Sequence, residues 1–165
     1  AGVGFTWRET LRTSAFWMMG IASALSWVPG GAIFVHIVPY LTEVGISRMM
    51  AGTTVTFITA ITIAGRLGFG WLGDRVDKRY VMATAYTLQA IGILIFSQIR
   101  ETWHLIPFLL VFSPGYGGSI PVRPALQREL FGIMAFGTIS GLFSIFSMVN
   151  IPSPVIAGWL RDTSG

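Results

Sequence analysis

The sequence predicts an all-α polytopic membrane protein with five transmembrane helices. Only 11% of the 165 residues are charged, against about 25% in a typical soluble domain, and the mean hydropathy is +0.68. The charges cluster and leave five long apolar runs between them. A span needs about 20 such residues, and it must be helical because lipid offers the backbone no hydrogen-bond partners. A soluble all-helical core is the alternative that this composition disfavours.

The apolar runs define the expected spans. Among Lys, Arg, His, Asp and Glu, the run after Arg12 holds only His36, the second run (49–73) holds only Arg66, the fourth (102–122) holds only His104, and the third and fifth hold none. No signal peptide is expected, because the first run is too long and lacks a cleavage site. We interpret the chain as one membrane domain (1–165) that is a piece of a larger protein. Its expected spans are residues 13–41, 49–73, 80–99, 102–124 and 133–160.

The basic residues predict how the chain is oriented in the membrane. The connections at one face hold six Lys or Arg residues, and those at the other face hold three. Because the richer face is normally cytoplasmic, we expect residues 74–79 and 125–132 in the cytoplasm and residues 43–48 and 161–165 outside. This describes a multi-pass protein of the cell (inner) membrane. The net charge of +4 follows the membrane pattern and does not indicate nucleic-acid binding.

The chain lacks the side chains of an intramembrane enzyme or a metal site. It has no cysteine, and its expected spans hold no carboxylate and a single histidine away from their ends, His36. A nucleophile, a base and metal ligands therefore cannot be assembled within the spans. We expect no enzymatic activity, no cofactor and no bound metal. A channel is disfavoured because no filter-like repeat is present.

An internal match suggests an inverted repeat. Residues 70–74 read GWLGD at the end of the second span, and residues 158–162 read GWLRD at the end of the fifth. In the expected topology these two ends lie on opposite faces of the membrane. Inverted repeats of this kind are typical of secondary transporters. On this interpretation the five spans come from a six-helix half whose last helix is absent.

The segment GWLGDRVDKR (70–79) resembles the signature loop of the major facilitator superfamily. The match consists of Gly70, Asp74, Arg75, Lys78 and Arg79, while Asp77 stands where the family usually has glycine. Further segments resemble the monocarboxylate and oxalate/formate carriers of that superfamily: HIVPYLTEVGIS (36–47), AGRLGFGWLGD (64–74), RPALQRELFG (123–132) and AGWLRDTSG (157–165). The resemblance implies helices seven to eleven of a twelve-helix transporter, completed by an N-terminal six-helix half and a last helix.

The resemblance also implies a role for the signature loop. In the superfamily this loop helps to hold one state of the carrier closed at the cytoplasmic face through charge contacts. We therefore expect a gating role for the five matching residues, with Glu129 as the partner of Arg75 or Arg79. The alternative is that these residues only set the topology and solvate a turn.

Arg66 is the main candidate for substrate binding. It lies inside the second span, where an ionisable side chain is costly and marks a functional site by default. Its helix face carries Gly52, Thr59, Thr62, Gly70 and Gly73, which are small or polar. A guanidinium binds a carboxylate through two hydrogen bonds, and the resemblance implies a substrate-binding arginine at this place in helix eight. The alternatives are snorkelling to the interface and a structural pin.

Three further residues are candidates for the substrate site. His36 is placed to titrate in proton-coupled transport or to donate to a substrate oxygen, or else it bonds a carbonyl freed by a neighbouring proline. Tyr116 lies in SPGYGGSIPVRP (113–124), whose prolines and glycines predict a bent, cavity-lining helix, although helix packing is the alternative. Asn150 is the strongly polar group of the fifth span.

These features together predict a secondary active transporter that moves a small organic anion by alternating access. If transport is coupled to protons, His36 is the candidate for the titrating group, and a structural or gating role is its alternative. The fifth span lacks the second cation of the oxalate-type carriers, which favours a monocarboxylate. The alternative is a multidrug or metabolite efflux carrier of the same superfamily, in which Arg66 is structural. The expected partners are the lipid bilayer, the rest of the transporter and the small organic anion.

Overall fold

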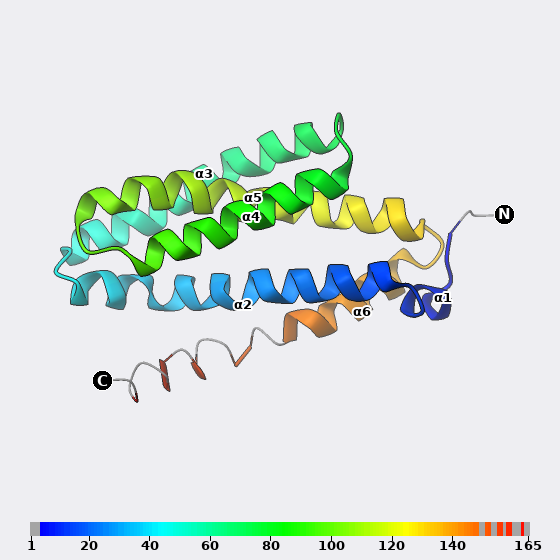
Figure 1. Cartoon of the computed structure of the whole chain (residues 1–165), viewed down its shortest axis with the longest axis horizontal. Coiled ribbons are helices and arrows are strands. Elements are labelled where there is room, and N and C mark those ends of the chain that lie inside the picture. Colours follow the sequence, from blue (N-terminus) through cyan, green and yellow to red (C-terminus); the bar gives the residue numbers. More distant parts are fainter. Residues whose placement is uncertain (1–3, 149–150, 153–154, 157, 160–162, 164–165) are drawn as a thin grey trace. The chain divides into compact units, whose positions relative to one another are not determined.

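The chain is helical over nearly all of the residues that the structure describes. The computed structural model describes residues 4–148, 151–152, 155–156, 158–159 and 163. The elements are α1 (Trp7–Leu11), α2 (Ser14–Glu43), α3 (Arg48–Gly73), α4 (Lys78–Ser97), the 3-10 turn η1 (Thr102–His104), α5 (Leu105–Phe131) and α6 (Phe136–Met148) (Figure 1). The described residues form no strand beyond a single bridge between Gly4 and Gly132.

These helices confirm the prediction of an all-α polytopic membrane protein. Four of them, formed by residues 14–43, 48–73, 78–97 and 102–131, are long and apolar enough to cross a membrane. The fifth expected span begins as α6, which is 13 residues long, and the remainder of 133–160 lies partly outside the described residues. Large apolar side chains point away from the protein on these helices, such as Leu67 and Leu94 at 73% and 67% exposure. A lipid environment accounts for such exposure, since lipid and apolar side chains are equally apolar.

The ends of the helices follow local signals. Ser47 caps the start of α3 by accepting a hydrogen bond from the Met50 amide (3.3 Å). Asp77 caps the start of α4 by accepting one from the Arg79 amide (2.8 Å). Gly132 ends α5 with a φ of +77°, a left-handed conformation that glycine adopts without strain.

One element extends further than expected. Residues 125–131, predicted as part of a cytoplasmic turn, form the last turns of α5, and the chain turns only at Gly132. The segment 113–124 is also helical throughout despite its three prolines. Each proline removes one backbone donor, but the surrounding packing keeps the helix unbroken.

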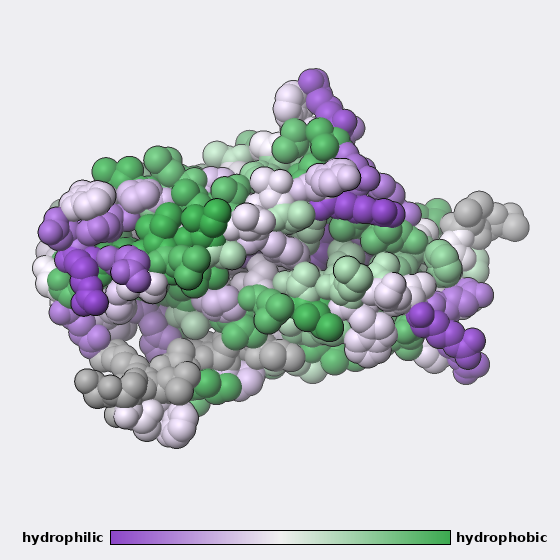
Figure 2. Space-filling view, in the orientation of Figure 1, coloured by the Kyte–Doolittle hydropathy of each residue, from purple (hydrophilic) through white to green (hydrophobic). Residues whose placement is uncertain are grey.

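The contacts divide the chain into two compact units. Unit 1 combines Ala1–Gly31 with Arg123–Gly165, and unit 2 is Ala32–Val122. Both α2 and α5 contribute residues to each unit. The single-domain assignment stays a prediction. In unit 2, the view in Figure 2 shows hydrophilic residues gathered at the ends of the helices and hydrophobic ones between them, as expected for helices that cross a bilayer.

In unit 2, α5 packs against α3 and α4 through residues without side chains. A Cβ atom on Gly65 of α3 would lie 2.7 Å from the Cα of Pro114 on α5, and one on Gly115 would lie 2.7 Å from the Ala85 carbonyl oxygen on α4. A Cβ on Gly117 would collide with the Thr62 carbonyl. The glycines of 113–124 therefore let three backbones approach closely, as small residues do between membrane helices.

Two side-chain hydrogen bonds also join α5 to α3 and α4. The Thr62 hydroxyl donates to the Ser113 carbonyl oxygen (3.4 Å), and the buried Gln89 side chain donates to the Gly115 carbonyl oxygen (3.2 Å). On the side toward α2, the core contains Ile37, Leu41, Phe108 and Phe112 at 0% exposure. The position of α5 in unit 2 is thus set from three sides.

Unit 1 is held by a cluster of phenylalanines. Phe16 of α2 packs on Phe143 of α6, with ring centroids 4.7 Å apart, and on Phe131 of α5 at 6.4 Å. All three rings are 2% exposed. The side chain of Phe146 lies directly over Gly20. These rings fix the start of α6 against α2 and the end of α5.

The contact between Gly65 and Pro114 yields a matched test. We expect Gly65→Ala to destabilise the protein by about 1–3 kcal/mol, because the new methyl group meets backbone atoms that cannot rotate away. Gly68→Ala, one turn along the same helix, meets no atom within 4 Å and is expected to be neutral or stabilising by up to about 1 kcal/mol. Thermal unfolding of the two purified variants measures the difference; equal melting temperatures would refute the close contact.

Candidate functional site

Arg66 lies on an open side of α3, within the membrane-spanning part of the helix. It is eight residues before Asp74, about 12 Å from the end of the helix at 1.5 Å per residue. Its side chain is exposed, and within the described residues the guanidinium has no hydrogen-bond or ion-pair partner. A permanent cation left without a counter-charge at this depth attracts an anion.

The predicted face of Arg66 divides into a covered part and an open part. Thr62 and Gly73 are buried, and Thr62 bonds to α5 as described above. Gly52 and Gly70 are different, since a Cβ atom on either would meet no atom within 4 Å. Gly70 lies one turn from Arg66, so the helix surface next to this arginine is open, whereas Gly52 lies about 21 Å away along α3 at 1.5 Å per residue.

Tyr116 of α5 is the predicted site residue that lies within electrostatic range of Arg66. The positive charge of Arg66 acts electrostatically on the Tyr116 phenol. The Tyr116 ring is half-buried and is held by Phe34 of α2 (centroids 5.1 Å apart) and by Phe112 (5.7 Å). The two ring contacts thus hold the Tyr116 side chain on the helix that packs against α3.

The other two candidates remain predictions. His36 is half-buried on α2, two residues after Phe34 along the helix. Asn150 lies outside the described residues.

The signature loop forms a compact turn between α3 and α4. Asp74 follows the last residue of α3, and its amide bonds the Gly70 carbonyl oxygen (3.2 Å). The departure from the family pattern at Asp77 has a structural use, since this carboxylate caps α4. Lys78 and Arg79 begin that helix. The gating role of these residues stays a prediction.

The structure gives Arg75 a neighbour that the sequence analysis missed. Its guanidinium lies over the Trp71 ring, 4.0 Å from the centroid. Cation–π contacts are strongest with tryptophan, and the four-residue spacing across the end of α3 is the signal that could have revealed this pair. Glu129, the predicted partner of Arg75 or Arg79, belongs to unit 1, so their pairing stays a prediction.

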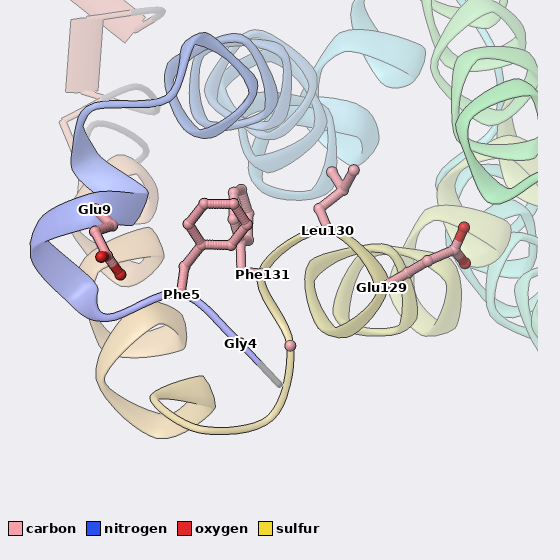
Figure 3. A pocket seen from close by; sticks show the side chains of 7 residues that line it. Gly4, Phe5, Glu9, Glu129, Leu130 and Phe131 are labelled. Carbon is pink, nitrogen blue, oxygen red and sulfur yellow. The ribbon is translucent and has the colours of Figure 1, made fainter. Parts of the chain in front are cut away.

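A pocket in unit 1 places two carboxylates near the end of α5. It has a volume of about 520 Å³ and is lined by Gly4, Phe5, Glu9 and residues 129–132. Figure 3 shows that the Glu129 side chain points away from Phe5 and Glu9. The two carboxylates therefore do not converge, and the described residues contain no group of three or more potential metal ligands.

Comparison with known proteins now adds to this geometry. No protein-family model matches the chain. Over 138 residues it is 31% identical to monocarboxylate transporter 12 of Rattus norvegicus, covering 81% of this chain and 28% of that protein. It is 29% identical over 133 residues to an MFS-type transporter of Gibberella moniliformis, and 23% identical over 136 residues to an uncharacterised MFS-type transporter of Escherichia coli. The last two alignments cover 78% of this chain.

The chain is homologous to major facilitator superfamily transporters. It resembles the monocarboxylate transporters within that superfamily, which confirms the resemblance that its motifs carry. It spans 28%, 32% and 33% of the lengths of the three relatives named above. These relatives are named as transporters and not as enzymes, in agreement with the prediction from the sequence. The place of the chain within a twelve-helix protein stays a prediction.

The capping box of α1 gives a pH-dependent test. The Thr6 amide and hydroxyl both donate to Glu9 Oε2 at 2.8 Å, and these hydrogen bonds hold the pKa of Glu9 below its ordinary value of 4.5. Because the folded pKa is lowered, the box is complete above pH 4.5 and is lost as the pH falls through the lowered pKa. We expect Thr6→Val to raise the pKa of Glu9, measured by NMR titration of labelled glutamate; an unchanged pKa would contradict the assignment.

Proposed function

We propose that this chain forms part of a secondary active transporter that moves a small monocarboxylate by alternating access. The observation that carries the proposal is Arg66, an exposed cation inside a membrane-spanning helix with no hydrogen-bond or ion-pair partner in the described residues. In this proposal Arg66 binds the carboxylate, and Tyr116 lies beside it. The similarity to monocarboxylate transporters supports the choice of substrate class.

The proposal places the chain as helices seven to eleven of a twelve-helix carrier. The open part of the Arg66 face, beside Gly52 and Gly70, is where the N-terminal half would complete the cavity. His36 serves as the titratable group of proton coupling, and Asn150 as a further polar group toward the substrate. The signature loop and Glu129 gate the cytoplasmic side.

The first test is transport by the full-length protein in proteoliposomes. Uptake of labelled lactate, benzoate and oxalate is compared with uptake of a cationic dye. We expect carriage of a monocarboxylate, and a rise in KM of about tenfold to a hundredfold in Arg66→Gln, since a charged hydrogen bond contributes about 1.5–3 kcal/mol. Arg66→Lys keeps the charge but not the planar fork, so an intermediate KM is expected.

Arg48→Gln is the matched control for Arg66→Gln, because it removes an exposed arginine from the other end of the same helix. Transport of the dye but not of the carboxylates would favour the efflux carrier. Carboxylate transport that survives Arg66→Gln would make the arginine structural. A His36→Gln variant run with and without an inward proton gradient tests coupling, and an unchanged response to the gradient would remove His36 from it.

The proposed orientation can be tested by labelling, because this chain contains no cysteine. Val76 in the α3–α4 turn and Gln98 after α4 are both exposed and lie at opposite ends of a helix about 30 Å long. We expect a membrane-impermeant maleimide to label Gln98→Cys in intact bacterial spheroplasts and Val76→Cys only after the membrane is opened. Labelling in the reverse order would overturn the cytoplasmic assignment of residues 74–79.

A further inference from the structure

Unit 1 contains a second site with the chemistry of anion binding. A cavity of about 310 Å³ lies among α2, the end of α5 and α6, at the lower end of the range of about 300–1,000 Å³ for ligand pockets. Its polar lining consists of Arg123 and Gln127 of α5 with Ser140, Ser144 and Ser147 of α6. No carboxylate is present among the residues that line it.

Arg123 supplies a cation whose position is fixed. It lies eight residues before the end of α5, about 12 Å into the helix. Its guanidinium stacks over the Trp27 ring of α2, 4.1 Å from the centroid. A guanidinium held flat on an indole keeps its N–H groups in the plane of the fork, where they can still donate to a carboxylate. Trp27 therefore orients the cation for a ligand in the cavity.

Gln127 leaves a hydrogen-bonding group unused beside this cation. The residue is 3% exposed, and one end of its side-chain amide is bonded to the Ser140 hydroxyl (3.3 Å). The other end has no partner within the described residues, although it belongs to a side chain that lines the cavity. This end of the amide is therefore available to a ligand atom in the cavity.

The remaining walls determine what kind of anion fits. The hydroxyls of Ser144 and Ser147 donate to carbonyl oxygens of their own helix (3.2 and 2.6 Å). Arg123, with its five N–H groups, and Gln127 are the donors that we assign to the ligand. Trp27, Phe136 and Phe143 supply aromatic walls. One cation and an apolar wall suit a monoanion with a small apolar body, and not a dianion or a phosphate.

We propose that this cavity is a carboxylate-binding subsite in which Arg123 and Gln127 bind the carboxylate of a small aliphatic or aromatic acid. It names a second place where the proposed monocarboxylate binds, and to that extent it rests on the proposed function. Arg66 belongs to unit 2 and does not line this cavity.

The test observes Trp27 directly and does not require transport. The full-length protein is labelled with 5-fluorotryptophan in phosphatidylcholine nanodiscs, and the Trp27 resonance is assigned by its loss in Trp27→Phe. Benzoate is the probe, with benzamide as its neutral analogue. We expect benzoate to shift the Trp27 fluorine resonance saturably, and benzamide to have no effect at the same concentrations.

Variants then assign the donors. We expect the half-saturating benzoate concentration to rise at least tenfold in Arg123→Gln and several-fold in Gln127→Leu. The matched control is Arg8→Gln, because Arg8 also stacks on an indole, that of Trp7 at 5.0 Å, but lies outside the cavity; it is expected to bind benzoate as the wild type does. If Arg123→Gln does not fold, which the other fluorotryptophan resonances reveal, Gln127→Leu alone decides.

Three outcomes would overturn the subsite. They are an unmoved Trp27 resonance, an equal shift in the Arg123 and Gln127 variants, and displacement of benzoate by inorganic phosphate or by phosphatidylglycerol at lower concentration, which would indicate a phosphate or lipid-headgroup site. If benzoate shifts the Trp27 resonance but the protein transports no carboxylate, the subsite is retained and the transport proposal is rejected. If the protein transports a carboxylate but the Trp27 resonance does not shift, the transport proposal is retained and the subsite is rejected.

Discussion

The close contact of α5 with α3 and α4 is the constraint on which the rest of unit 2 depends. At Gly65, Gly115 and Gly117 there is no room for even one methyl group, because the opposing atoms belong to the backbones of Pro114, Ala85 and Thr62. Membrane helices gain little from burying apolar surface against one another, so close packing of this kind has to hold them together. The hydrogen bonds from Thr62 and Gln89 then fix the position of α5 along its partners.

This constraint also explains where the candidate site lies. Packing of Thr62 and Gly65 against α5 turns the neighbouring Arg66 to the edge of the contact, where it remains exposed. The same contact sets the height of Tyr116, which follows Gly115 on α5. The close approach of the helices at three glycines brings Arg66 within electrostatic range of the Tyr116 phenol.

The sequence predicted the helices better than it predicted their contacts. Runs without charge gave the membrane-spanning segments closely, since burial of a charge in lipid is costly wherever it occurs. The segment around Tyr116 was harder to interpret. Glycine can mark either a flexible backbone or a close approach, and only the presence of Thr62 and Pro114 on the other side distinguishes the two. The extension of α5 to Phe131 was missed because charged residues indicate the membrane boundary, which is not where a helix must end.

Arg66 could be chosen as a candidate site residue from the sequence alone, because a single charged residue in an apolar run can be recognised without knowledge of the fold. Its proximity to Tyr116 could not be recognised in this way, since that requires the alignment of α3 with α5. The contact of Arg123 with Trp27 was missed for the same reason, because it depends on how α5 packs against α2.

The glycine contacts have a consequence for how the chain assembles during synthesis. Chains enter the membrane from the N-terminus onward, so α3 and α4 are made before the helix that packs between them. Until α5 is made, Gly65 lacks its contact with Pro114, and the Gln89 side chain lacks the Gly115 carbonyl oxygen to which it donates in the folded protein. The last of these three helices to be made is therefore the one that fixes the positions of the other two. A ribosome pause before Leu105 would prolong the state in which α3 and α4 are in the membrane without α5.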